Sequence, residues 1–259
     1  MSADQVSSAR EFVKTVELAS ALPLTMRAAP QAPFDFDAAR EQAAVVGSEV
    51  IAFATGVTRD QRNDVVNATM LAQLVARKQV PEPTTLGELL AWYDHYFDAL
   101  SRIGFVIQDK GFAEYVERGD TFEAHQAVLD VVSVLLAGSP AALALVKKTL
   151  EALQKMSPDS KWITLFDRES RSANTARFQV SLVSPDPGAP FLVSVVAFGL
   201  EATSTVTQVL FFKFRRNSVK LQHHFGKATI NATILEAVRD DVVARLRAFA
   251  NDFFAGFEL

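Results

Sequence analysis

The spacing of apolar residues along the chain changes near residue 161. Before this point, apolar side chains recur at every third or fourth position, which is typical of helices with one buried face. From residue 161 they alternate with polar side chains or occupy consecutive positions, which predicts strands. A helical pattern returns over about 231–254. The expected order is therefore helices, then a meander of strands, then one helix.

The helical part begins with one helix within residues 1–34, followed by a linker that contains three prolines. Further helices are expected at 37–53, from Thr58 to Pro81, from Thr85 to about Gly104, at 106–117, and as two helices within 121–155. The segments 37–80 and 121–155 are each expected to form a helical hairpin.

Capping signals in the sequence indicate where several of these helices begin. Thr58 and Thr85 are each followed three residues later by Gln or Glu, which is the pattern of a capping box. Ser139 precedes Pro140, which suits an N-cap followed by the first helical position. The helix opened by Thr121 is apolar on nearly all sides, so it is expected to be buried.

Strands are expected at 161–167, 175–184, 190–201, 205–216 and 218–225. In the second of these, three apolar residues alternate with Arg177, Gln179 and Ser181, so one face of that strand is expected to be wet. Residues 191–200 are instead apolar on both faces, and so is "TQVLFFKFRRNS" (207–218) as far as Phe212.

Strands that are apolar on both faces require helices on both sides of one sheet. The pattern therefore predicts an α+β fold with three layers, helix, sheet and helix. The expected division is an N-terminal helix and linker over 1–34 and a single domain over 35–259.

The composition of the chain excludes several classes of function. The 259 residues are 49% hydrophobic and 22% charged, as in an ordinary globular protein, and the net charge of −4 argues against a nucleic-acid-binding protein. The chain contains no cysteine, which excludes disulfides, thiolate catalysis, cysteine zinc sites and thioester acylation.

No targeting segment is predicted. The N-terminus has Asp4 and lacks a continuous apolar core, so it does not resemble a secretory signal. The most apolar window, 127–148, is interrupted by Asp130 and by 138–140, and neither half reaches the ~20 apolar residues of a transmembrane helix. We expect synthesis in the cytoplasm, with release by lysis or by an accessory machine.

Catalytic motifs are not found. No glycine-rich phosphate loop follows a strand, and none of His95, His125, His223 and His224 has the i, i+4 partner of a helical metal site. His223 and His224 would point to opposite faces of a strand. We expect no metal and no cofactor, while an enzymatic activity of unrecognised type stays open. If the protein is an enzyme, its best polar candidates are Asp64, Asn67 and Gln73.

Two segments have the composition of lipid-contacting surfaces. The apolar candidates lie in the 121–155 hairpin and in the 205–216 strand, and they are Val131, Val134, Leu135, Leu136, Leu143, Val146, Leu210, Phe211, Phe212 and Phe214. The alternative for the hairpin is that it is simply a buried part of the core.

Basic residues follow the second segment. Lys213, Arg215, Arg216 and Lys220, with Lys227 further on, could meet anionic phospholipid headgroups. The alternative is a charged strand end that discourages edge-to-edge pairing with another sheet.

Parts of the sequence resemble known cytolysins. "KWITLFDRES", "TARFQVSLVS", "FLVSVVAFGLEATSTVTQVLFFKF" and "VKLQHHFGKATIN" resemble, in order and spacing, the strand region of the Cyt cytolytic toxins, with a tryptophan-led first strand. "AFATGVTRDQRNDVVNATMLAQLVA" and "WYDHYFDALSRIGFV" are similar to the Erwinia virulence factor (Evf) family, whose fold is shared with the Cyt toxins and with volvatoxin.

The resemblance implies a cytolysin-like fold, a mostly antiparallel sheet wrapped by helical hairpins, in which 207–214 would be a central strand covered on both faces. Cyt toxins are associated with membrane permeabilisation. The Evf protein is thought to be palmitoylated on a core cysteine, which this chain lacks. A fatty acid held noncovalently between sheet and helices remains compatible with the sequence.

The first functional hypothesis is therefore a bacterial virulence or toxin-like protein, monomeric or a small homo-oligomer, that exposes apolar helices or strands to a lipid membrane. The alternative is a non-lytic protein that binds a fatty acyl ligand. Neither hypothesis involves nucleic acid.

Overall fold

The computed structural model describes residues 3–20, 34–108, 111–115, 121–136, 138–203, 206, 213–215, 219–249 and 253–259. Its centre is one sheet in the order β11-β1-β2-β7-β8-β10-β3, with β4 paired to β10 and β6 paired to β7. All pairings in it are antiparallel except that of β2 with β7. Its strands are β1 (Gln42–Val46), β2 (Glu49–Phe53), β3 (Phe105–Gln108), β4 (Ala113–Glu114), β6 (Arg171–Ser172), β7 (Thr175–Ser184), β8 (Leu192–Ala202), β10 (Val219–Ile230) and β11 (Phe254–Glu258).

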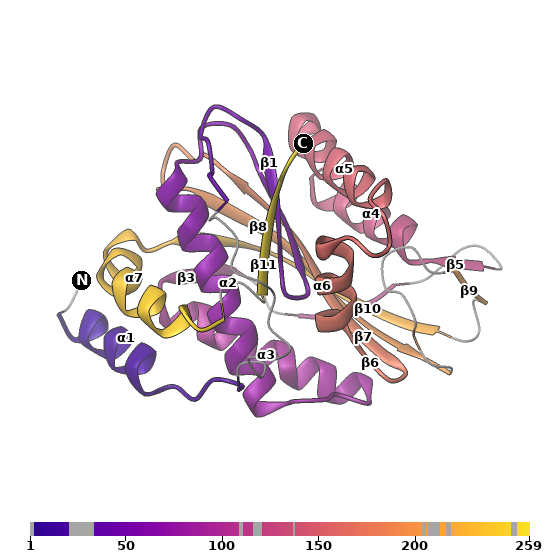
Figure 1. Cartoon of the computed structure of the whole chain (residues 1–259), viewed down its shortest axis with the longest axis horizontal. Coiled ribbons are helices and arrows are strands. Elements are labelled where there is room, and N and C mark those ends of the chain that lie inside the picture. The colour runs from indigo at the N-terminus through magenta and orange to yellow at the C-terminus, as the bar shows by residue number, and fades with distance from the viewer. Residues whose placement is uncertain are drawn as a thin grey trace.

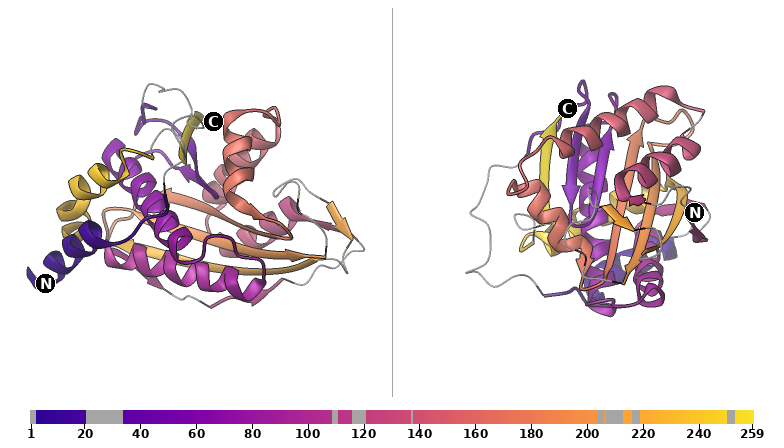
Figure 2. Two further views of the ribbon diagram at one scale, coloured as in Figure 1. Left: turned by 60° about the horizontal axis from the view of Figure 1, so that its bottom comes forward. Right: turned by 90° about the vertical axis from the view of Figure 1, so that its right-hand side faces the viewer.

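Helices cover both faces of this sheet (Figures 1 and 2). One face carries α1 (Ala3–Thr15), α2 (Arg59–Gln79), α3 (Leu86–Arg102) and α7 (Ala232–Leu246). The other carries α4 (Ala124–Leu135), α5 (Pro140–Gln154) and α6 (Lys161–Ser170). Each layer has its own hydrophobic cluster against the sheet. The predicted α+β class, the three layers and the mostly antiparallel sheet are confirmed.

Two of the predicted caps are confirmed. Thr58 and Thr85 each accept a hydrogen bond from the backbone of the residue three positions on, and Gln61 and Glu88 complete both capping boxes. α5 begins at Pro140 as expected, although the Ser139 side chain makes no capping hydrogen bond. The hairpin expected within 121–155 is present as α4 and α5.

The prediction of a helix at 37–53 is wrong. This segment is a β-hairpin, β1 and β2, joined by a two-residue turn in which Gly47 has φ +55°. All ten strand residues are buried, and the run is rich in β-branched side chains. A short, continuously apolar run fits either a buried helix or a strand, and burial on both faces favours the strand here.

Two further predictions are wrong about the class of secondary structure. Residues 161–167 belong to α6, whose N-cap Ser160 accepts a hydrogen bond from Ile163 and whose Leu165 and Phe166 are buried. The expected helix at 106–117 is instead β3 and β4 within its described part. The final helix ends at Leu246, after which the chain returns to the sheet as β11.

The described part of the strand predicted at 205–216 does not lie in the central sheet. β8 pairs directly with β7 on one side and with β10 on the other, so no position is left between them. The described part, β9 (Lys213–Arg215), pairs instead with β5 (Thr121–Glu123) in a separate two-stranded sheet. Residues 207–212 lie outside the described residues.

Candidate functional site

The two faces of the sheet differ in chemistry, and β7 shows the difference most clearly. Phe178, Val180 and Leu182 point into the cluster that contains α4, α5 and α6. Arg177, Gln179 and Ser181 occupy the opposite face, under α2 and α3, and they are between 0 and 5% exposed. The expected wet face is therefore buried. Arg177 contacts Trp92 on α3, and Gln179 and Ser181 are hydrogen-bonded to Ser48 and Glu49 of the β1–β2 hairpin.

Hydrogen bonds join the α2–α3 layer to this polar face. The Tyr93 hydroxyl on α3 donates toward the backbone oxygens of Phe198 and Phe178, at 2.7 and 3.1 Å. Gln73 on α2 donates to the backbone oxygen of Val46 at 2.7 Å, and its side-chain oxygen accepts from Ser48 N at 3.0 Å. Leaving such buried groups unpaired costs about 1–3 kcal/mol each, so this layer is held by directional bonds as well as by apolar contact.

Glu49 lies within the same buried network. Its carboxylate oxygens accept hydrogen bonds from the Tyr96 and Ser181 hydroxyls, the former at 2.6 Å and the latter at 2.5 Å. Burial raises the pKa of Glu49 to about 7, and the two hydrogen bonds only partly offset that effect. The carboxyl group is consequently largely protonated below neutral pH.

The α4–α5 hairpin contacts the opposite face of the sheet through apolar side chains. Its inward residues share one hydrophobic cluster with Phe178 and Phe198, whose rings stack 4.8 Å apart on β7 and β8. These inward residues are Ala127, Val128, Val131, Val132, Leu136, Leu145, Val146, Leu150 and Leu153. A salt bridge of 2.9 Å from Lys148 on α5 to Glu41 joins two half-exposed side chains at the rim. Such exposed pairs contribute at most about 1 kcal/mol.

The outer face of α4 is polar, contrary to the expectation that this helix is apolar on nearly all sides. Gln126 and Asp130 are exposed and hydrogen-bonded to each other at 2.8 Å, and the Tyr115 hydroxyl donates to Asp130 at 2.9 Å. Val134, one turn further along, is 72% exposed. The hairpin is thus amphipathic, with a wet outer surface and an apolar inner one.

The candidate lipid-contacting residues fall into three groups. Val131, Leu136 and Val146 are buried against the sheet, Leu135 and Leu143 are half-buried, and Val134 is exposed. Lys213, Phe214 and Arg215 form β9, and Lys220 is exposed on β10. Leu210, Phe211, Phe212 and Arg216 lie outside the described residues.

The structure brings the two candidate segments together. β5 leads directly into α4, and it pairs with β9 so that Phe122 lies opposite Phe214 and Glu123 opposite Lys213. This ribbon lies at the end of the molecule opposite α1 (Figure 1). Lys227 does not join the basic group, because it lies seven positions from Lys220 along β10, about 23 Å at the usual strand rise.

Two of the three polar residues considered for an enzyme have structural partners. Asp64 forms a two-point ion pair with Arg239, both N···O distances being 2.7 Å, and Gln73 is hydrogen-bonded to the β1–β2 turn. Asp64 and Asn67 line one small hollow of about 10 Å³, as their helical spacing suggested. Among the described residues, no group of three or more His, Asp or Glu side chains could hold a metal ion.

The histidine pair lies as predicted, with its two rings on opposite faces of β10. His224 is buried beside Phe97 and Phe112, and its Nδ1 is 2.7 Å from the backbone oxygen of Gly111. The ring of His223 instead packs near Tyr115.

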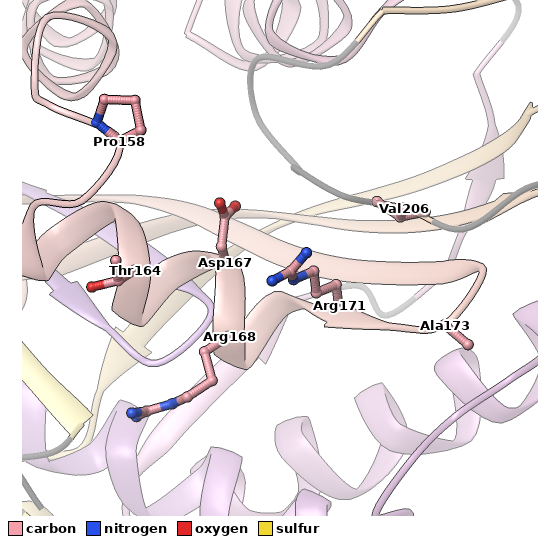
Figure 3. A pocket seen from close by; sticks show the side chains of 7 residues that line it. All are labelled: Pro158, Thr164, Asp167, Arg168, Arg171, Ala173 and Val206. Atoms are coloured by element: carbon pink, nitrogen blue, oxygen red, sulfur yellow. The ribbon is translucent and has the colours of Figure 1, made fainter. Parts of the chain in front are cut away.

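A surface hollow of about 550 Å³ beside α6 was not foreseen from the sequence. Its walls include Thr164, Asp167 and Arg171, together with Val206. Figure 3 shows Asp167 and Arg171 near each other, one helical turn apart, while Arg168 points the other way. No spacing rule predicts this hollow, since it depends on how the β6–β7 turn packs beside α6.

No protein-family model matches the chain, and no curated protein matches it. Two solved structures are similar over most of its length. A delta-endotoxin aligns with 84% of this chain and 96% of its own, at 15% identity and a TM-score of 0.40. The Evf virulence factor aligns with 78% of this chain and 82% of its own, at 8% identity and a TM-score of 0.36. Both scores are low, so the function proposed below rests on the chain's own contacts.

Proposed function

We propose that the protein acts at lipid membranes, as a toxin-like or virulence-type protein, by releasing the α4–α5 hairpin from the sheet. The observation that carries this proposal is the difference between the two helical layers. The α2–α3 layer is joined to the sheet by buried hydrogen bonds, whereas the inner face of the hairpin is joined to it by apolar side chains.

Contact with lipid affects these two attachments differently. In water, burial of apolar surface stabilises the attached hairpin by roughly 25 cal/mol for each Å² of apolar surface buried. Lipid tails are as apolar as leucine, so a bilayer removes most of that driving force. Buried hydrogen bonds have no replacement partners in lipid, so the α2–α3 layer remains attached.

The released hairpin would lie along the membrane surface rather than cross it. The 12 residues of α4 and the 15 of α5 extend only about 18 and 22 Å, against a hydrocarbon thickness of about 30 Å. Within the part of the chain that the structure describes, no helix has the length and hydropathy to span a bilayer. An amphipathic helix of this kind buries its apolar face at the headgroup boundary.

A reversible lock tests the proposal. Because the chain has no cysteine, a pair introduced between α5 and β2, at positions with Cβ atoms about 3.8 Å apart, would form a single defined disulfide. We expect the oxidised variant to lose dye release from liposomes and to recover it on reduction. The matched control is a cysteine pair joining α1 to α7, which should leave release unchanged. Equal release from the oxidised and reduced hairpin variant would contradict the mechanism.

The alternative, a fatty acid held between sheet and helices, stays a prediction from the sequence resemblance. The space between α3 and the sheet is occupied by Trp92, Tyr93 and Tyr96, all at most 1% exposed. A ligand there would have to displace these rings. Native mass spectrometry of the gently purified protein would detect such an adduct, and a clean unliganded mass with excess fatty acid would argue against it.

A further inference from the structure

The connection between α4 and α5 presents apolar side chains at the surface of the molecule. Val134 is 72% exposed, the largest exposed fraction among the large apolar side chains of the described residues. Leu135 and Leu143 are half-buried, at the edge of the hydrophobic cluster that joins the hairpin to the sheet. We call residues 134–136 and 138–144 together the hairpin tip.

The hairpin tip lies within a stretch that has no charged residue, 131–146. Charged residues make up 22% of the whole chain, so their absence is unusual for a segment that lies partly at the surface. The other exposed residues of the tip are small or uncharged, namely Gly138, Ser139, Pro140, Ala141 and Ala144. The tip therefore offers a surface that is apolar or weakly polar throughout.

Charged side chains begin again at both ends of this stretch. Asp130 is exposed on α4, and Lys147 and Lys148 are exposed on α5. At 1.5 Å per residue along a helix, Asp130 lies roughly 9 Å from Leu136, and Lys147 lies roughly 12 Å from Ser139. An amphipathic helix at a membrane surface buries its apolar face about 5–10 Å into the headgroup boundary. The uncharged end of the hairpin is as long as such a contact requires.

The length and composition of the tip favour lipid over a protein as its partner. A stable protein interface takes roughly 20–30 residues from each side and surrounds its apolar centre with a polar rim. The tip is shorter than this and contains no charged residue that could form such a rim. The headgroup boundary of a bilayer accepts small and apolar side chains without a complementary pattern of charge.

We propose that the hairpin tip is the first segment to enter a lipid bilayer, while the hairpin is still attached to the sheet. Val134 inserts at the headgroup boundary, and this contact brings lipid to Leu135 and Leu143 at the edge of the hairpin's attachment. The inference rests on the proposed function, because it supplies the step that precedes release of the hairpin.

Flotation with phosphatidylcholine vesicles tests this order of events, because the disulfide lock between α5 and β2 separates docking from release. We expect the oxidised, locked variant to float with the vesicles as the wild-type protein does, without releasing dye. Val134→Asp, in the wild type and in the locked variant, should lower partition into the vesicles roughly tenfold or more, because an apolar side chain is lost from the contact. Partition should persist in about 0.5 M sodium chloride, since screening affects only charged contacts.

Val243→Asp is the matched control. It makes the same change at a 42% exposed position of α7, in the helical layer on the other face of the sheet, and it should bind vesicles as the wild type does. Both replaced side chains are exposed, so both variants should fold, which circular dichroism and the Tm would check.

Three results would overturn the inference and leave release of the hairpin standing. The first is wild-type binding by Val134→Asp, and the second is binding of the locked variant only after reduction, since release would then precede contact. The third is a dimer, formed without lipid, that Val134→Asp dissociates, which would assign the tip to a second copy of the chain. No vesicle binding by the wild-type protein would instead overturn the proposed function, and this inference with it.

Discussion

At the scale of single residues, the most informative group is the buried carboxyl of Glu49. Its pKa is about 7 in the folded protein against an ordinary value of 4.5, so between these pH values the folded state holds a proton that the unfolded state has released. Its contribution to stability is therefore complete below pH 4.5 and is lost as the pH rises through 7. The loss is about 3 kcal/mol at ~1.4 kcal/mol for each pH unit.

Glu49→Gln tests this dependence, because a neutral amide cannot ionise. We expect the free energy of urea unfolding to fall between pH 5 and pH 8 in the wild type and to fall much less in the variant. Glu151→Gln, at an exposed position of α5, is the matched control and should follow the wild type. A full pH dependence in Glu49→Gln would show that another group is responsible.

The burial of the polar face of β7 could not be predicted from the sequence pattern alone. Arg177, Gln179 and Ser181 alternate with apolar residues, which is the normal pattern of a strand with one wet face. One signal did indicate otherwise: Trp92, Tyr93 and Tyr96 crowd one side of α3, and buried indole and phenol groups need polar partners. Which strand supplies those partners depends on tertiary packing, which periodicity does not encode.

At the scale of elements, most long patterns predict the right class and short ones do not; α6, a ten-residue helix where a strand is expected at 161–167, is the exception among the long ones. α2, α3, β7 and β8 each extend over ten residues or more, and their caps or alternation identified them. β1 and β2 have five residues each, and the described part of β9 has three. In runs this short, the helix and strand patterns coincide, so the pattern over the two hairpin strands at 42–53 predicts a helix. The Gly47-Ser48 pair between two β-branched runs was the available signal for a hairpin.

The proposed mechanism predicts different opening energies for the two helical layers. The α4–α5 hairpin should open locally at a lower free energy than α2 and α3, because fewer directional bonds have to break. Amide hydrogen exchange followed by mass spectrometry should show peptides from 124–154 exchanging faster than peptides from 59–102. Urea below the unfolding transition should leave the faster exchange of the hairpin nearly unchanged, since local opening exposes little additional surface.

Equal protection of both layers, at the free energy of global unfolding, would contradict local release of the hairpin. Slower exchange of the hairpin than of α2 and α3 would indicate that the α2–α3 layer is the one that moves.

At the scale of the whole molecule, the layers place α1 far from the proposed membrane surface. α1 packs on α7, where Arg10 donates to the backbone oxygen of Ala237 at 3.0 Å and Arg245 donates to that of Lys14 at 3.1 Å. Val13 is fully buried in the cluster on the α2–α3 side of the sheet, and the backbone N–H of Ala19 bonds to Leu74. α1 and the α4–α5 hairpin therefore lie on opposite sides of the sheet (Figure 2).

Deletion of residues 1–20 tests this division of the molecule. Burial of Val13 alone accounts for roughly 1.5–3 kcal/mol, so the shortened chain should keep its circular dichroism spectrum but unfold at a lower urea concentration. If the hairpin is the membrane-active element, dye release from liposomes should continue at the wild-type level under conditions where the shortened chain is folded. Loss of release by a folded, shortened protein would place the lipid-contacting surface on the α1–α7 side instead. The Cys-locked hairpin would then release dye as well as its reduced form, so the two experiments together identify which face of the sheet meets the membrane.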